Sequence, residues 1–215
     1  MTDLVLYTHP MSRGRIVRWM LEEVGQPYRT EILEFGATRS PAYLAVNPMG
    51  KVPALTHGET VVTECAAICA YLADAFPETG LAPPVGDPAR GSYYRWLFFA
   101  AGPVEAAATN KALGFEVPDD PRKRGMAGYG SLAAVLDTLE GAVSDRPYLV
   151  GDRFTAADLY LGSHLMWGMQ FGTIEKRAAF QQYVEPLAAR PAAVKAREID
   201  DGLLAAANPA GGAGM

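Results

Sequence analysis

The sequence is poor in cysteine and histidine, and neither residue is spaced as a disulfide framework or a metal site requires. Among 215 residues there are 2 cysteines and 3 histidines. Cys65 and Cys69 lie four positions apart in a predicted helix, on one face of it, and the histidines are scattered without ligand spacing to them. We therefore expect no metal site, and a reducing cytoplasm is the expected location.

Long hydrophobic runs and clusters of one charge are also missing. No stretch approaches the roughly eighteen apolar residues of a membrane-spanning helix, and the first residues, MTDLVLYTHP, do not form a secretory signal. The 19 lysines and arginines face 24 aspartates and glutamates, for a net charge of -5 without a basic cluster. Nucleic acid and membrane are therefore not expected partners. The composition, 49% hydrophobic and 20% charged, is that of a soluble globular protein.

The first 80 residues alternate between strand-like and helix-like patterns. One helix is expected from Ser12 to Val24 and another from Glu64 to Phe76, and a helical turn is expected at Ser40–Pro41. Short apolar or alternating runs predict strands at 4–7, 28–33, 52–56 and 60–62. The resulting order β-α-β-α-β-β-α is typical of a thioredoxin-like domain, in which the first two strands are parallel.

The rest of the chain is predicted to be helical. Two prolines in the segment 81–87 indicate a linker between a domain at 1–80 and an all-helical domain at 88–207. Helices are expected at 88–113, at 122–143, from Thr155 onward, and in two shorter segments that end near Ala206. Thr155 and Asp158 form a capping box, which we assign to structure and not to catalysis. Residues 208–215, rich in glycine and alanine, are expected to be a flexible tail.

Three segments of the first domain carry residues suited to holding an extended peptide. In NPMGKVPAL (47–55), a cis bond before Pro53 turns the N–H and C=O of Val52 outward, whereas a trans proline in a turn is the alternative. The segment TECAAI (63–68) opens a helix whose free N–H groups favour a carboxylate, and Glu64 suits an ammonium, although acidic residues begin many helices. Ser12 is either an ordinary helix cap or a hydroxyl that donates to a thiolate.

Four stretches make the chain similar to bacterial glutathione transferases of the serine type across nearly its whole length: LYTHPMSRGRIVRWMLEEVG, NPMGKVPAL, TECAAICAYL and YLVGDRFTAADLYLG. The resemblance implies a cytoplasmic enzyme that takes glutathione as co-substrate and activates its thiol for attack on a small apolar electrophile. It also implies a homodimer, in which a patch of the first domain meets helices of the partner's second domain. A glutathione-dependent thiol-disulfide oxidoreductase, an isomerase and a non-catalytic binding module stay open as alternatives.

The resemblance also implies roles for individual residues. Ser12 matches the residue that activates the thiol, and Thr8 and Tyr7, close to the position used by tyrosine-type relatives, stay open as alternatives. Cys65 stands where a serine or threonine is usual, so the backbone N–H there is expected to carry more of the carboxylate binding. Glutathione contacts are implied for Lys51, Val52, Pro53, Glu64, Cys65 and Arg39. The second-substrate pocket is expected to include Met11, Phe98, Phe115 and Trp167, apolar residues that suit a domain interface.

Overall fold

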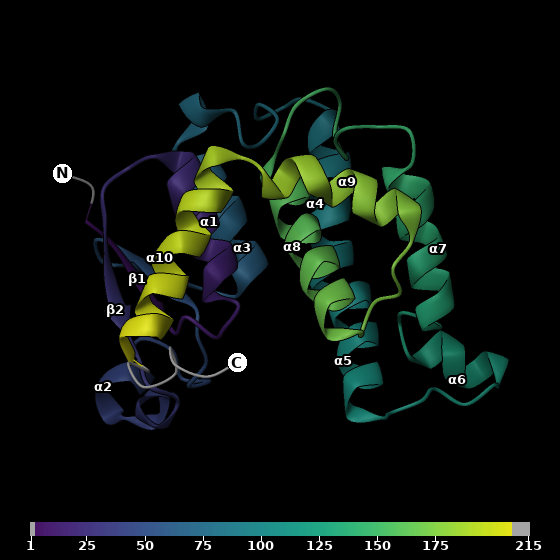
Figure 1. The fold of residues 1–215 in the computed structure, drawn as a ribbon, viewed down its shortest axis with the longest axis horizontal. Coiled ribbons are helices and arrows are strands. Elements are labelled where there is room, and N and C mark those ends of the chain that lie inside the picture. The colour runs from purple at the N-terminus through teal and green to yellow at the C-terminus, as the bar shows by residue number, and fades with distance from the viewer. Residues whose placement is uncertain (1–2, 208–215) are drawn as a thin grey trace. The chain divides into compact units, whose positions relative to one another are not determined.

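The computed structural model describes residues 3–207, which divide into two compact units (Figure 1). The first, which we call the sheet unit, runs to Thr79 and resumes at Ala189; the second, the helical unit, is Gly80–Ala188. This division differs from the expected helical range 88–207, because the last helix groups with the sheet unit. The predicted tail, 208–215, lies outside the described residues.

A four-stranded sheet forms the centre of the sheet unit. Its strands β1 (Leu4–Thr8), β2 (Tyr28–Ile32), β3 (Ala54–His57) and β4 (Thr60–Thr63) lie in the order β2-β1-β3-β4. The strands β1 and β2 are parallel and are joined by helix α1 (Gly14–Val24), whereas β3 is antiparallel to β1 and to β4. The thioredoxin-like order is confirmed. Strand β3 begins two residues later than predicted, because Pro53 has no N–H to donate to a ladder.

Helix α1 is buried around its whole circumference. The six consecutive residues from Ile16 to Leu21 are all buried, which covers more than one turn of a helix. Helix α1 packs on β1, on α3 (Cys65–Ala75) and on α10 (Pro191–Ala207), and Figure 1 shows α10 running alongside it. With 17 residues, α10 is longer than the short final helix that we predicted.

The remaining short elements of the sheet unit lie between β2 and β3 and directly after α3. A 3-10 helix at Phe35–Arg39 precedes α2 (Pro41–Leu44), whose first turn is capped by the Ser40 side chain. The helical turn predicted at Ser40–Pro41 is thus confirmed. A second 3-10 helix, Pro77–Thr79, closes this part of the unit.

The helical unit contains more breaks than its sequence periodicity indicated. The helix predicted at 88–113 is interrupted by a π-helical turn at Ala100–Val104, which contains Pro103, a residue that cannot donate a helical hydrogen bond. The helix predicted at 122–143 is divided in two, because Gly128 and Gly130 adopt a φ of 70°. The helices are α4 (Ala89–Phe99), α5 (Glu105–Leu113), α6 (Pro121–Met126), α7 (Leu132–Val143), α8 (Ala156–Phe171) and α9 (Ala178–Ala188).

Helix α8 is the core of the helical unit. It packs against α4 and α9, and the predicted capping box of Thr155 and Asp158 at its start is confirmed. The buried Asp158 carboxylate also accepts hydrogen bonds from the Leu149 amide at 2.7 Å and the Tyr183 hydroxyl at 2.8 Å. Within residues 3–207, none of the helices combines the length and the apolar character that crossing a membrane requires.

Candidate ligand site at one end of the sheet

The strand register brings three loop segments together at one end of the sheet. Tyr7 of β1 pairs with Ala54 of β3, and Ala54 pairs with Thr63 of β4. The end of β1, the start of β3 and the end of β4 therefore lie side by side. The turn that carries Ser12, the segment that ends at Pro53 and the start of α3 all leave the sheet at this end.

Ser12 lies in a tight turn between β1 and α1. Its amide and its hydroxyl both donate to the carbonyl of His9, at 3.0 and 2.7 Å, and the amide of Gly14 donates to the Ser12 hydroxyl at 3.0 Å. We had predicted that Ser12 directly precedes α1, but that residue is Arg13. The Ser12 oxygen still accepts a hydrogen bond from an amide of the first turn, that of Gly14. Since a hydroxyl has one proton, donation to a ligand replaces the bond to His9.

The two alternative hydroxyls lie in different surroundings from Ser12. Thr8 is 0% exposed, and Gly14 covers it so closely that a Cβ at position 14 would lie 1.7 Å from Thr8 Oγ1. Tyr7 lies on the face of β1 opposite to Thr8, because successive side chains alternate along a strand. Its ring centroid is 5.9 Å from that of Tyr43. The Ser12 side chain is half-buried and thus remains accessible.

The Val52–Pro53 peptide bond is cis, as predicted from the sequence. Pro53 is buried, whereas Val52 is half-buried. Among residues 3–207, neither the amide nor the carbonyl of Val52 has a hydrogen-bond partner. Both groups are therefore available to an extended chain that lies along this edge.

Two residues that sequence reasoning missed hold the segment before Val52. The Asn47 side-chain amide and the Tyr43 hydroxyl both donate to the carbonyl of Lys51, at 2.8 and 2.5 Å, and Asn47 Oδ1 accepts from the Met49 amide at 3.0 Å. Burial raises the pKa of Tyr43 to about 12, so this donor keeps its proton at neutral pH. An asparagine before a proline is a turn signal that points to Asn47, but no local pattern marks Tyr43.

Arg39 and Lys51 are exposed cations in the segment between β2 and β3. Gly50, with a φ of 60°, lets the chain pass closely beneath Arg39: a Cβ there would lie 2.8 Å from the Thr38 carbonyl oxygen and 3.1 Å from Arg39 Cδ. The Arg39 side chain therefore crosses the residue that directly precedes Lys51. Two positive charges lie near the open backbone of Val52, where an anionic end of a ligand can meet them.

Glu64 and Cys65 begin α3 next to the Ser12 turn. Glu64 has φ 66° and ψ 120°, a backbone conformation that costs a residue with a Cβ about 1–3 kcal/mol and that clusters at functional sites. The Cys65 thiol donates to the Arg13 carbonyl at 3.4 Å, which ties the start of α3 to the Ser12 turn. Within the described part of the chain no side chain caps α3, so its first N–H groups and the exposed Glu64 carboxylate suit a ligand that carries both a carboxylate and an ammonium.

The residues expected at the second-substrate pocket are divided between the two units. Met11 is 68% exposed in the Ser12 turn, Phe98 and Phe115 are 70% and 64% exposed in the helical unit, and Trp167 is half-buried. Phe115 lines a cavity of about 340 Å³ together with Lys111, Arg124 and Tyr129.

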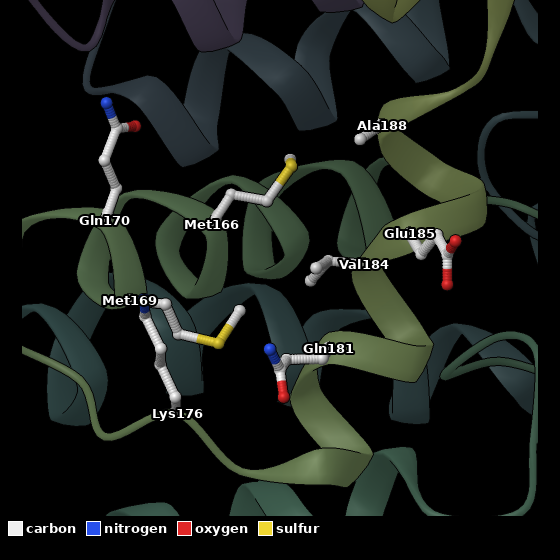
Figure 2. A pocket seen from close by; sticks show the side chains of 8 residues that line it. All are labelled: Met166, Met169, Gln170, Lys176, Gln181, Val184, Glu185 and Ala188. Atoms are coloured by element: carbon white, nitrogen blue, oxygen red, sulfur yellow. The ribbon is translucent and has the colours of Figure 1, made fainter.

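Another cavity of the helical unit, of about 450 Å³, lies between α8 and α9 (Figure 2). Its lining combines apolar side chains with amides and charges: Met166, Met169, Gln170, Lys176, Gln181, Val184, Glu185 and Ala188. Neither Phe98 nor Trp167 lines either of these two cavities.

Comparison with known protein families matches both units of the chain. Residues 6–80 match the model described as glutathione S-transferase, N-terminal domain, which covers the strands and loops of the candidate site. Residues 106–167 match the model described as glutathione S-transferase, C-terminal domain.

Individual relatives extend this match over most of the chain. A glutathione S-transferase of Escherichia coli O157:H7 is 34% identical over 145 residues, 65% of this chain and 70% of that protein. A maleylacetoacetate isomerase of Pseudomonas aeruginosa is 30% identical over 199 residues, 87% of this chain and 92% of that protein. The solved structure of a sphingomonad glutathione S-transferase complexed with glutathione is 28% identical, with a TM-score of 0.75 over 92% of this chain and 98% of that one. The chain therefore belongs to the glutathione S-transferase family.

Proposed function

We propose that this chain binds glutathione at the described end of the sheet and stabilises its thiolate with Ser12 for attack on an apolar electrophile. The observation that carries the proposal is the register of β1, β3 and β4, which brings the Ser12 turn, the open Val52 backbone and the uncapped start of α3 together. The glutathione in the related sphingomonad structure supports the choice of ligand.

Each part of glutathione has a matching group in this proposal. The backbone of Val52, held in place by the cis bond to Pro53, pairs with the cysteinyl residue. Glu64 and the N–H groups at Cys65 take the ammonium and the carboxylate of the γ-glutamyl end, and the exposed Lys51 and Arg39 take the glycyl carboxylate.

Ser12 lowers the pKa of the thiol by the difference between two hydrogen bonds. Its hydroxyl gives up a neutral bond to the His9 carbonyl, worth about 0.5–1.5 kcal/mol, and gains a bond to a charged sulfur, worth about 1.5–3 kcal/mol. A net gain of about 1–1.5 kcal/mol lowers the pKa by about one unit. The Gly14 amide, which donates to the Ser12 oxygen at 3.0 Å, strengthens the hydroxyl as a donor.

The chemical step needs little more from the protein than the thiolate and its position. The sulfur donates an electron pair to the electrophilic carbon, a C–S bond forms, and the leaving group departs with the electrons of its own bond. Holding the two reactants together supplies the remaining advantage over the reaction in water.

A substitution at Ser12, paired with one at the buried neighbouring hydroxyl, tests the proposal. Ser12→Ala is expected to raise the pKa of bound glutathione by about one unit, measured from thiolate absorbance against pH, and to lower turnover of an activated aryl halide about tenfold at a pH below that pKa. Thr8→Val keeps the shape of the buried side chain and is expected to leave the thiol pKa unchanged. A shift in Thr8→Val without one in Ser12→Ala contradicts the role of Ser12, and absence of glutathione binding at millimolar concentration contradicts the whole proposal.

A glutathione-dependent isomerase is the second candidate function. It is supported by the similarity to the isomerase of Pseudomonas aeruginosa, 30% identical over 87% of this chain. The same Ser12-stabilised thiolate serves as a nucleophile that adds to the substrate and is later released. The two functions differ in the fate of glutathione, because transfer consumes one glutathione per turnover and isomerisation consumes none.

We further propose that two copies of the chain form a homodimer. Val61 is 46% exposed on the edge strand β4, and in the helical unit Tyr94 and Phe98 are exposed one turn apart on α4. These apolar side chains fit the expected pairing, in which the sheet unit of one copy meets helices of the partner.

A further inference from the structure

Helix α10 is joined to α1 by ion pairs along most of its length. The Arg18 and Asp200 side chains form a buried pair at 2.9 Å, Lys195 pairs with Glu22 at 2.7 Å, and Arg190, which directly precedes α10, pairs with Glu23 at 2.6 Å. The numbers rise along α1 as they fall along α10, so the two helices are antiparallel. The late residues of α10 therefore lie at the start of α1, where the Ser12 turn enters.

A fourth pair connects α10 to the Ser12 turn itself. Arg15, in the first turn of α1, places Nη2 2.7 Å from Asp201 Oδ1 and donates from Nε to the carbonyl of Pro10 at 2.5 Å. Pro10 lies between His9, whose carbonyl accepts from the Ser12 hydroxyl, and Met11, whose amide donates to His9 Nδ1 at 3.1 Å. One guanidinium thus bridges the turn and the last helix.

We propose that Asp201 is a positioning residue that acts through Arg15 to hold the Ser12 turn in the geometry that thiolate stabilisation requires. This inference rests on the proposed function of Ser12. Asp201 does not touch the ligand in this proposal: its carboxylate fixes the rotamer of Arg15, and Arg15 in turn fixes the Pro10 carbonyl.

The geometry of arginine is what makes the bridge work. A guanidinium presents several N–H donors in one rigid plane, so a bond from Nη2 to Asp201 sets the direction of Nε toward Pro10. Without the carboxylate, the long Arg15 side chain is free to take other rotamers, and the turn loses one of its anchors. The Asp201 side chain is 57% exposed, so the pair adds little to stability and its effect is mainly on geometry.

The residues proposed to bind glutathione lie on other segments than Arg15 and Asp201. A substitution at Asp201 can therefore affect the Ser12 turn without affecting glutathione binding. The residues proposed to hold the peptide are Arg39, those that directly follow Gly50 and those at the start of α3, and none of them contacts Arg15 or Asp201 through a described hydrogen bond. Loss of the Asp201 carboxylate is therefore expected to lower kcat and to raise the thiol pKa. The KM for glutathione is expected to stay within about twofold of the wild-type value.

The test combines Asp201→Asn with a matched control at the other end of the same helix pair. Asp201→Asn is expected to raise the pKa of bound glutathione by about half a unit, which lowers the thiolate fraction about threefold below that pKa. Arg190→Gln breaks an equally short pair between the residue that directly precedes α10 and Glu23 of α1, far from the turn, and is expected to leave the thiol pKa unchanged. Asp201→Glu is expected to restore most of the wild-type pKa.

The double variant distinguishes positioning of Ser12 from a general structural effect. If Asp201 acts through Ser12, Asp201→Asn has no further effect on the thiol pKa in the Ser12→Ala background. Additive shifts, or equal shifts in Asp201→Asn and Arg190→Gln, overturn the inference. If Ser12→Ala itself leaves the pKa unchanged, the proposed function of Ser12 fails and this inference falls with it; a shift in Ser12→Ala alone overturns only the role of Asp201.

Discussion

At the scale of single residues, the two cysteines of α3 differ in what surrounds them. Cys65 stands at the first position of the helix, where its thiol donates to the Arg13 carbonyl at 3.4 Å beside the proposed ligand site. Cys69, one turn later, is 0% exposed, and burial raises its pKa from 9.0 to about 12. The sequence spacing predicts that both lie on one face, but only the packing of α3 makes Cys69 a neutral apolar residue.

The buried Cys69 thiol predicts a loss of stability in alkaline solution. Above pH 9 the thiol of the unfolded chain releases its proton while the folded one keeps it up to about pH 12, so the free energy of unfolding falls as the pH rises through that interval. Between pH 8 and pH 10 the wild type is expected to lose about 1.4 kcal/mol more than Cys69→Ala, measured by urea unfolding. The pKa of Tyr28, raised from 10.0 to about 12 by burial, adds a similar loss only above pH 10. Parallel stability curves for wild type and variant contradict the prediction.

At the scale of an element, the start of α8 depends on one buried carboxylate. Asp158 accepts from the Thr155 amide and hydroxyl, the Leu149 amide and the Tyr183 hydroxyl, all within 2.9 Å. Removing the carboxylate leaves several buried donors without an acceptor, each costing about 1–3 kcal/mol. We therefore predict that Asp158→Ala lowers the free energy of unfolding by more than about 3 kcal/mol in urea denaturation.

A cap on a more exposed helix provides the control for Asp158. The Ser131 hydroxyl accepts from the Ala134 amide at 3.1 Å at the start of α7, in an exposed position. Ser131→Ala is expected to cost about 1 kcal/mol, as is usual for a single cap. Similar losses in the two variants would mean that burial adds nothing at Asp158.

At the scale of the whole molecule, the two edges of the sheet allow a test of the proposed homodimer. Val61 on β4 and Ile32 on β2 are both branched apolar residues at opposite edges, 46% and 40% exposed. Val61→Lys introduces a charge into the proposed interface and is expected to shift the elution mass from two chains to one. Ile32→Lys carries the same change outside that interface and is expected to elute as the wild type does. A dimer that persists in Val61→Lys excludes the β4 edge from the interface.

Much of the fold could be predicted because its signals are local. Periodicity and turn residues were sufficient for the four strands, for α1 and α3, and for the capping box of Thr155 and Asp158, since each depends on residues a few positions apart. In the helical unit, the prediction from periodicity was wrong about helix length. Pro103 and the Gly128–Gly130 segment interrupt helices that the apolar pattern alone predicts to be continuous.

The candidate site was only partly predictable. Ser12, Val52, Pro53 and Glu64 were identified from the sequence because each stands in a short motif with a known use. Asn47 and Tyr43 were missed because their importance comes from hydrogen bonds to Lys51 that no spacing reveals.

By itself the sequence determined which segments become strands and helices and which short motifs carry chemistry, because those properties follow from neighbouring residues. The tertiary structure alone decided that Tyr7, Ala54 and Thr63 share one row of the sheet, and that Asp201 near the C-terminus reaches Arg15 near the N-terminus. The physical reason is that strand register and helix docking depend on contacts between residues far apart in the chain, and local patterns do not encode them.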